Sequence, residues 1–350
     1  PIEDTGKTIT DNEPPLQRAV DYLLNNKKLL NIKLDTRFDY QGKFNDHETE
    51  ESSFRAQAIK VVFDGEIVPG VRYLVRQRLN KSQDGSLARD NNGSATDFAF
   101  FELDAGEKWT FRVGKQPVLL GTFEIDYNPA DVYLSTLIND DLDGYKTGIN
   151  TAYKTGKHVL NLQVVNSDAP QFSTEKYKKK AFAGLFLWEG TLVKDIWKTR
   201  SGVGAFQHDG SKYYNWLTIG NKLNINRFTS EIDFYMGERN ITFNSLIPDQ
   251  KLVKEQAVSV NLMYDSGKFR PVLKGTWNKR RDQATGSSLI NAGIQAGVEY
   301  NPFSDPLLKN LRFHAVYIYN RTNFNGVYNY VDGYNQNTVI VGMRWLVKVM

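Results

Sequence analysis

Apolar and polar side chains alternate over eleven consecutive residues, from Leu30 to Tyr40. Successive side chains of a β-strand point to opposite faces, so this segment has one apolar face and one that carries charges such as Lys33 and Arg37. Eleven residues are long for a strand of a globular domain and match a tilted strand that crosses a bilayer. The segment is therefore predicted to be a membrane-spanning strand or, as the alternative, one layer of a soluble β-sandwich.

The same period-two pattern recurs along the chain and predicts about sixteen strands, an even number typical of bacterial outer-membrane barrels. After the first strand it covers residues 54–64, 71–76, 96–104, 109–113, 145–154, 158–166, 181–188, 196–207, 213–223, 227–238, 255–265, 268–278, 288–300, 311–319 and 338–348. The phase slips near Ala58-Ile59, which predicts a β-bulge. Long polar connections are expected at 41–52, 80–95, 117–142 and 239–254, with short turns such as 65–69 between most other strands.

Composition is compatible with such a barrel and excludes several other classes. Mean hydropathy is −0.49, and apolar runs such as Ala181–Trp188 are far shorter than the roughly 20 residues of a membrane helix. The chain has no Cys, which excludes a disulfide scaffold, a thiolate metal site and a Cys nucleophile. A net charge of +4 is mild and gives no reason to expect nucleic acid as a partner.

Aromatic residues mark the ends of the predicted strands. In the expected strand direction, several would gather at one boundary of the membrane and form an interfacial girdle. These are Trp109, Trp197 and Phe269 at strand starts, and Tyr153, Trp188, Tyr264 and Tyr300 at strand ends.

We therefore predict an all-β protein, a 16-stranded antiparallel transmembrane β-barrel with an inward-folded loop and a short N-terminal helix. Lipid offers no hydrogen bonds, so a sheet that spans a membrane must close on itself. Residues 29–350 would form the barrel, and residues 1–28 a periplasmic segment. In that segment Leu16, Val20, Leu23 and Leu24 recur at helical spacing after Pro14-Pro15.

The connection at residues 117–142 is long and acidic, and it contains no Lys or Arg. A long loop of this kind is unusual in a compact soluble domain, and it is explained if the loop folds into a wide pore. We therefore expect residues 117–142 to form a constriction, with Glu124, Asp126 and Asp131 as its acidic side.

Basic residues at inward positions of the neighbouring strands are the candidates for the opposite side. Arg72, Arg76 and Arg78 are separated by even steps, so one strand points all three the same way, opposite Val71 and Val75. The full predicted basic wall comprises Lys33, Arg37, Arg55, Arg72, Arg76, Arg78 and Arg112. The hypothesis is a transverse field that orders water and slows apolar solutes. The alternative is that these are ordinary solvated charges.

Two stretches around the loop support a family resemblance. Phe111-Arg112-Val113-Gly114-Lys115, followed by Val118, Gly121 and Glu124, resembles the entry to the inward loop of the porin O/P superfamily, whose members include phosphate-selective porins. Leu137–Asn150 resembles the strand that follows that loop. The resemblance implies a sixteen-stranded diffusion channel, often trimeric. This chain departs from the pattern in ending on Met350 rather than an aromatic residue, and in having an acidic loop.

The predicted function is passive diffusion of small hydrophilic solutes and ions across a Gram-negative outer membrane, with at most a weak anion preference. Expected partners are outer-membrane lipid, lipopolysaccharide and two further copies of the chain in a homotrimer, with no cofactor. The alternatives are a specific channel for phosphate or oligosaccharides, and a soluble secreted glycan-binding β-protein. No enzyme is expected, because His47, His158, His208 and His314 lie in no catalytic motif.

Two charged clusters have competing interpretations. Asp140, Asp141 and Asp143 could bind Ca²⁺, but they lack the full alternating ligand pattern, so a turn that caps the next strand is favoured and no metal is expected. Lys176 and Lys178-Lys179-Lys180 could contact lipopolysaccharide phosphates, although a solvated loop is the default.

Overall fold

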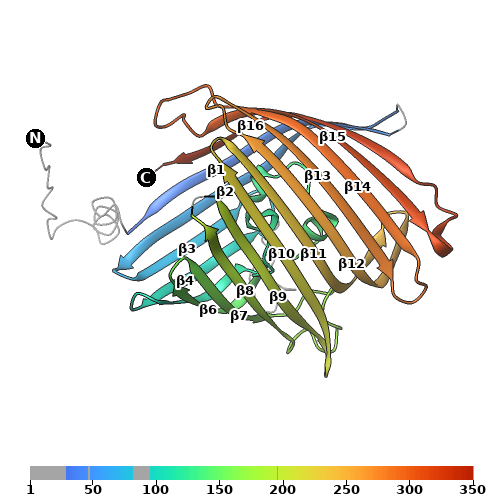
Figure 1. Ribbon diagram of the computed structural model, residues 1–350, viewed down its shortest axis with the longest axis horizontal. Helices are drawn as coiled ribbons and strands as arrows, with labels where there is room; N and C mark the ends of the chain where they lie inside the picture. Colours follow the sequence, from blue (N-terminus) through green and yellow to red (C-terminus); the bar gives the residue numbers. More distant parts are fainter. Residues whose placement is uncertain (1–28, 46–47, 82–94, 195, 350) are drawn as a thin grey trace, which may run out of the picture.

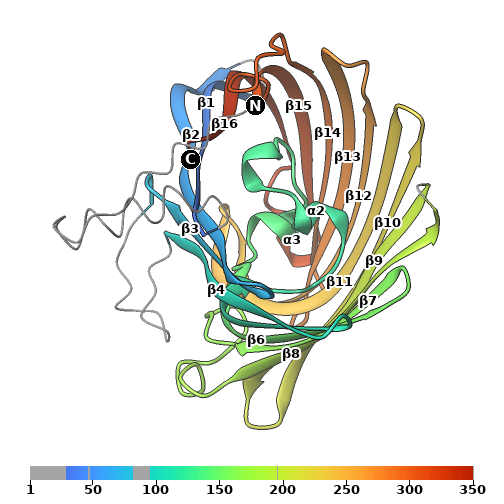
Figure 2. The same cartoon turned by 90° about the vertical axis from the view of Figure 1, so that its left-hand side faces the viewer.

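Sixteen antiparallel strands form one closed barrel, in which every strand pairs with its neighbours in the chain and β1 closes on β16 (Figures 1 and 2). The computed structural model describes residues 29–45, 48–81, 95–194 and 196–349, so the helix expected within residues 1–28 lies outside the described residues. The strands are β1 (Asn31–Asn45), β2 (Glu48–Val68), β3 (Val71–Arg78), β4 (Thr96–Ala105), β5 (Trp109–Pro117), β6 (Tyr145–Thr155), β7 (His158–Asn166), β8 (Phe182–Val193), β9 (Trp197–Asp209), β10 (Lys212–Ile225), β11 (Phe228–Asn244), β12 (Ile247–Tyr264), β13 (Phe269–Asp282), β14 (Ser288–Tyr300), β15 (Leu311–Asn325) and β16 (Tyr334–Lys348).

The helices are short and lie in connections between strands. α2 (Phe123–Asp126), the 3₁₀ turn η1 (Pro129–Asp131) and α3 (Leu137–Asp140) belong to the connection between β5 and β6, and η2 (Gly326–Tyr328) lies between β15 and β16. Among the described helices, none has the length and apolar character needed to cross a membrane.

Burial in this barrel is inverted relative to a soluble protein. On β1 the side chain of Phe38 is 43% exposed, whereas its neighbours Arg37 and Asp39 are 2% and 5% exposed. On β14, Ile294 is 50% exposed and the adjacent Gln295 is 2% exposed. A β-sandwich would bury the apolar face, so that alternative is wrong. The apolar face points outward, as a lipid-facing surface must, and the charged face points into the lumen.

Strand pairing confirms the predicted bulge and corrects the loop boundaries. Arg37 pairs with Ala58 and Phe38 with Ala56, which leaves Gln57 as the extra residue. The loops expected at 41–52 and 239–254 are wrong, because the β1–β2 and β11–β12 ladders run on to within a few residues of the turn. Backbone pairing continues there although the side chains no longer alternate. The turn expected at 65–69 is likewise shorter, since β2 extends to Val68.

Aromatic side chains meet across strands at the end of the barrel where the predicted girdle lies. Trp109 on β5 contacts Tyr153 on β6 with ring centroids 4.7 Å apart, and Phe269 on β13 stacks on Tyr300 of β14 at 4.7 Å. Trp109 and Phe269 are 44% and 51% exposed on the outer surface. Exposed aromatic pairs of this kind suit a membrane interface.

The connection between β5 and β6, residues 118–144, lies inside the barrel and is called the inward loop here; Figure 2 shows α2 and α3 within the ring of strands. Its side chains Val118, Leu120 and Ile138 join a buried apolar cluster with Phe172 and with residues of β7 to β12. A second cluster packs Leu137 against residues of β11, β12, β14, β15 and η2. The loop therefore packs against the side of β7 to β15, where a small cavity of about 140 Å³ remains beside β12 to β15, and it leaves a larger space along β2 to β6.

We expect Ile294→Arg, a charge on the lipid face near the middle of β14, to lower the free energy of unfolding by about 2–4 kcal/mol. The same type of change at Leu307, which is 64% exposed in the connection between β14 and β15, should have little effect. Denaturant unfolding of the two variants in lipid vesicles measures the difference. Equal midpoints would show that Ile294 does not face lipid.

Candidate functional site

A buried carboxylate anchors the inward loop at its start. Glu124, 3% exposed, accepts from Lys274 Nζ at 2.7 Å, Tyr235 Oη at 2.8 Å and Thr136 Oγ1 at 2.7 Å. Burial alone would raise the pKa of Glu124, but Lys274 and the hydroxyl donors outweigh it and hold the pKa below its ordinary value. Glu124 therefore remains charged and ties α2 to β13, β11 and the start of α3.

The wall also binds the backbone of the loop. Asp233 on β11 accepts the N–H groups of Phe123 and Glu124, at 3.0 and 2.8 Å, which are the unpaired donors at the start of α2. Just before them, Gly121 has φ +90°, and a Cβ there would lie 2.4 Å from Thr218 Oγ1. Only glycine allows the chain to pass this close to β10.

Further ion pairs hold the middle and the end of the loop. Asp131 pairs with Arg312 of β15 and Arg344 of β16. Arg37 of β1 donates to the carbonyl oxygens of Ala130 and Val132, at 3.3 and 2.8 Å. At the far end, Asp141 pairs with Arg280 of β13. These contacts come from the arc of strands from β13 through β16 to β1, opposite β5 and β6 from which the loop starts and to which it returns, so the loop is fixed across the lumen.

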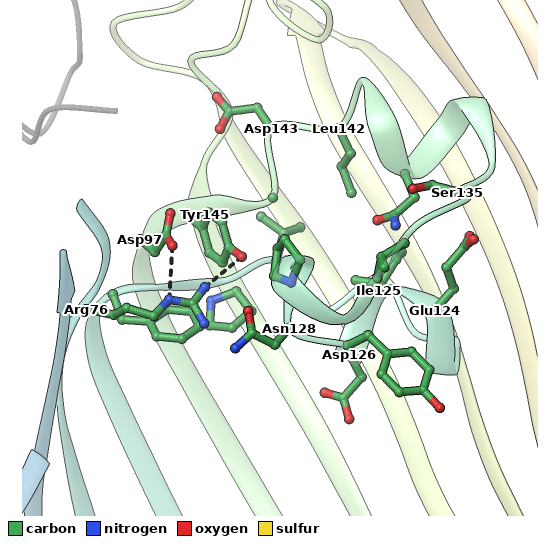
Figure 3. Close-up of a pocket in the computed structure, with 18 of the residues that line it drawn as sticks. Arg76, Asp97, Glu124, Ile125, Asp126, Asn128, Ser135, Leu142, Asp143 and Tyr145 are labelled. Atoms are coloured by element: carbon green, nitrogen blue, oxygen red, sulfur yellow. Dashed lines mark hydrogen bonds and ion pairs between the residues drawn. The ribbon is translucent and has the colours of Figure 1, made fainter. Parts of the chain in front are cut away.

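A cavity of about 620 Å³ remains between the inward loop and the wall formed by β2 to β6. Figure 3 shows Arg76 on one side and the loop residues Asp126, Asn128 and Asp143 around it. Five basic side chains line the cavity, Arg76, Arg78, Lys81, Lys115 and Arg200. Five acidic side chains also line it, Asp97, Glu124, Asp126, Asp140 and Asp143. Basic groups lie mainly on the wall and acidic groups mainly on the loop.

Arg76 is held rigidly on the wall side. It donates to Asp97 Oδ2 at 3.0 Å and to Tyr145 Oη at 2.8 Å, and its guanidinium lies 3.9 Å from the ring centroid of Phe98. Arg78 donates to the same carboxylate at 2.8 Å. Two arginines therefore share Asp97, which is 1% exposed, so this wall keeps an excess of positive charge.

The structure brings three of the seven predicted basic residues to the loop, namely Arg37, Arg76 and Arg78. The other four pair elsewhere with wall carboxylates. Lys33 binds Asp64, Arg55 binds Glu51, Arg72 binds Glu102 and Asp104, and Arg112 binds Glu102. A common inward direction was therefore not enough to place these four at the cavity.

The three predicted acidic residues divide in a similar way. Glu124 and Asp131 are anchors whose charges are neutralised by the wall, whereas Asp126 is exposed in the lumen, 3.2 Å from Arg200. Sequence reasoning missed the anchoring partners Lys274, Arg312 and Arg344, and the cavity residues Asp97, Lys81, Lys115 and Arg200. Alternation does place Lys274 and Arg312 on the inner face, but only the path of the loop determines that they pair with its carboxylates.

The three clustered aspartates at the end of the loop take different partners. Asp141 pairs with Arg280, and Asp143 pairs with Lys146 at 2.7 Å. Asp140 lines the cavity and is exposed in the lumen. Within the residues that the structure describes, no group of three or more His, Cys, Asp or Glu side chains is arranged to hold a metal ion.

Asp140 is the carboxylate of the cavity whose charge depends on pH near neutrality. Although it reaches water in the lumen, protein surrounds it, and this burial raises its pKa to about 6. The nearby charges of Glu124 and Asp141 also raise the pKa, while Ser135 and Lys274 oppose them. The acidic face of the cavity therefore loses charge when the pH falls below about 6.

Comparison with known proteins places the sequence in one family. The family model for phosphate-selective porin O and P matches residues 29–239, more than half of the chain. No curated protein matches the sequence.

Solved structures of outer-membrane channels share the fold. The outer membrane channel DcaP of Acinetobacter baumannii aligns with a TM-score of 0.63 and 12% identity, over 92% of this chain and 98% of that one. OmpT of Vibrio cholerae, in its trimer form, gives 0.61 and 13%, over 91% and 99%. The anion-selective porin of Comamonas acidovorans gives 0.56 and 11%, over 91% and 98%. At this identity the likeness establishes the fold alone.

Glu124→Gln should lower the stability of the folded barrel by about 3–5 kcal/mol, because it leaves the ammonium of Lys274 buried without a counter-charge. The double variant Glu124→Gln, Lys274→Met removes both charges and should recover most of the loss. Denaturant midpoints of the wild type and both variants in detergent test this. If the single variant is as stable as the wild type, the pair does not anchor the loop.

Proposed function

We propose, from the premise that the chain belongs to the phosphate-selective porin O and P family, that a transverse electric field across the cavity selects its solutes. The protein is an outer-membrane porin of the Gram-negative type, through which small hydrophilic solutes diffuse passively. Its family and fold point to a channel rather than an enzyme. We propose which residues select the solutes, and whether anions or cations pass more readily.

The observation that carries the proposal is the separation of charge across one cavity. Arg76, Arg78 and Lys81 lie on the wall side, and Asp126, Asp140 and Asp143 lie on the loop side. Opposed charges at a narrow point orient water and dipolar solutes, so an apolar solute must displace ordered water to pass. Small polar and dipolar molecules should therefore pass best.

The balance of charge supports a weak preference for anions. Basic and acidic side chains are equal in number around the cavity. Two of the acidic groups, however, are buried: Asp97 shares its single charge between the two lining arginines Arg76 and Arg78, and the charge of Glu124 is offset by Lys274, which is not a lining residue. A passing ion therefore meets slightly more positive than negative charge. A strong selectivity would need a clear excess of one sign.

A phosphate-specific channel is the second candidate, and the description of the family favours it. The arginines on the wall could bind an oxyanion, but Asp126 and Asp140 face the same cavity and would repel a divalent anion. Phosphate that blocks the chloride current at micromolar concentration would support this candidate over a general channel.

An oligosaccharide channel finds less support in the aromatic residues of the cavity. Phe98 and Tyr145 line it, but both are covered by Arg76. Tyr127 and Tyr133 donate their hydroxyl groups to wall carboxylates, which fixes them in the partition formed by the loop. These rings do not make a continuous track on which sugar rings could stack.

The remaining roles follow from the family and the surface. We infer that the chain has no catalytic activity and needs no cofactor or metal. The exposed apolar outer face supports contact with outer-membrane lipid, and the exposed side chains of Lys176, Lys179 and Lys180 support contact with lipopolysaccharide phosphates. A homotrimer is supported by the trimeric form of OmpT, a relative in fold.

Arg76→Ala with Arg78→Ala should shift the channel toward cations. A unit charge about 4 Å from a monovalent ion contributes about 1 kcal/mol even in water, so the anion-to-cation permeability ratio should fall several-fold. Arg72→Ala with Arg112→Ala removes the same charge from the Glu102 and Asp104 cluster and is the matched control, with a smaller expected shift. Reversal potentials in a salt gradient measure both. A larger shift in the control would move the selective step away from the cavity.

Acidification from pH 8 to pH 5 should increase the anion preference, because Asp140 becomes protonated below its pKa of about 6 and the acidic face loses charge. In Asp140→Asn the side chain is neutral at every pH, so the step centred near this pKa should disappear. Reversal potentials recorded across the pH range test the expectation. A step that persists in the variant would have to be assigned to another group.

A further inference from the structure

A second connection packs part of its chain, around Phe172, into the barrel beside the inward loop, whereas its lysines at 176, 179 and 180 are exposed. Residues 167–181 join β7 to β8, and we call them the latch segment. Phe172, at its centre, is 1% exposed, stacks on Phe206 of β9 with ring centroids 4.0 Å apart, and lies edge-on to Trp216 of β10 at 6.2 Å. It belongs to the same apolar cluster as Leu120 and Ile138 of the inward loop. The two loops therefore share one core inside the lumen.

Gln171 connects this segment to the end of the inward loop. Its side-chain Nε2 donates to the carbonyl oxygen of Asp141 at 2.7 Å. Its own carbonyl oxygen accepts the N–H of Asn240 on β11 at 2.7 Å, and Arg239 donates to its Oε1 at 3.3 Å. One residue thus holds the inward loop and the barrel wall together.

A salt-bridged lysine at the start of β6 also connects the latch segment to the inward loop. Lys146, at the start of β6, lies 2.7 Å from Asp143 of the inward loop and 2.5 Å from Asp168 of the latch segment. Its side chain is 12% exposed, so water screens the bridge only partly. The bridge fixes the point where the inward loop enters β6.

The polar contacts of Gln171 and Asp168 act on the second half of the inward loop, and Phe172 shares its apolar cluster with both halves. The first half is held directly by the wall, through Asp233 and Arg37. The second half carries Asp140 and Asp143, two of the acidic groups on the cavity. Wall contacts reach it through Arg280 and Asp141, and the latch segment adds support from the other side.

We propose that the latch segment is a positioning element of the channel. Gln171 and Phe172 hold the acidic half of the inward loop at its distance from Arg76 and Arg78, and so set both the open area and the field at the cavity. The claim about the field rests on the function proposed above, whereas the claim about the position of the loop does not. Neither Gln171 nor Phe172 contacts a charged side chain that lines the cavity. Their effect on selectivity must therefore act through the position of the inward loop.

A reporter cysteine can measure the position of the loop independently of its charges. The chain has no cysteine, and Asn139 lines the cavity, so Asn139→Cys introduces one thiol there without changing the net charge. In this background, the double variant Gln171→Ala, Phe172→Ala is compared with the parent protein that carries only Asn139→Cys. Thr174→Ala, in the same segment, is the matched control, because the contacts of Thr174 run through its backbone.

In the Gln171→Ala, Phe172→Ala variant, the cysteine should react with a small cationic methanethiosulfonate at least about tenfold faster, which corresponds to about 1.4 kcal/mol of lost loop closure. Reversal potential and open-channel noise should change with it, and Thr174→Ala should match the parent. Gln171→Ala alone, which keeps the apolar core, serves if the double variant fails to fold. Unchanged labelling and noise in a folded variant would overturn the proposal.

The two proposals fail in different ways. If Asp126→Asn with Asp140→Asn leaves the permeability ratio of the wild type unchanged, the transverse field is wrong, but the labelling rate still decides the role of the latch segment. If that pair shifts the ratio while the latch variant changes neither labelling nor ratio, the field stands and the latch does not position it.

Discussion

Every backbone N–H and C=O group of a strand in the bilayer must find a partner within the protein, because lipid provides none. In this chain that requirement is met by pairing each strand with its neighbours and by closing β1 on β16 over a ladder from Lys33 to Phe44. Closure then decides which face is polar. The outward face must be apolar, so charges can point only into the lumen.

An interior built in this way has to neutralise its charges locally. Arg37, Arg239 and Lys60 are among the largest fully buried side chains, a composition opposite to that of a soluble core. Arg239 is paired with Glu255, and Arg37 with Asp39 and the carbonyl groups of the inward loop. Because buried ions are costly unless they are paired and hydrogen-bonded, the loop is held where its carboxylates and carbonyls meet these cations. The anchoring of the inward loop is therefore a consequence of closing the barrel.

The sequence predicts the parts of this structure that depend on local periodicity. Alternation identifies the strands, their inward faces and a bulge near Ala58, which the structure places at Gln57, because each is a property of neighbouring residues. It does not predict that the β1–β2 and β11–β12 hairpins extend beyond the alternating segments, since pairing there involves the backbone. Nor does it predict which inward charges meet the loop. Lys274 lies 150 residues from Glu124, and no local pattern relates the two.

The same limit explains why only part of the predicted basic wall lies at the inward loop and the cavity. Arg72 and Arg76 share a strand and a direction, yet Arg72 pairs with Glu102 and Asp104, while Arg76 reaches the cavity. What separates them is the depth at which the inward loop crosses the lumen, and this depends on packing against β7 to β15 and on the latch segment. The loop and the latch segment occupy much of one side of the barrel, where a cavity of only about 140 Å³ remains beside β12 to β15, so the larger open space lies along β2 to β6. Which wall residues line the open path therefore depends on the loops that occupy the opposite side of the lumen, as much as on the strands that carry these residues.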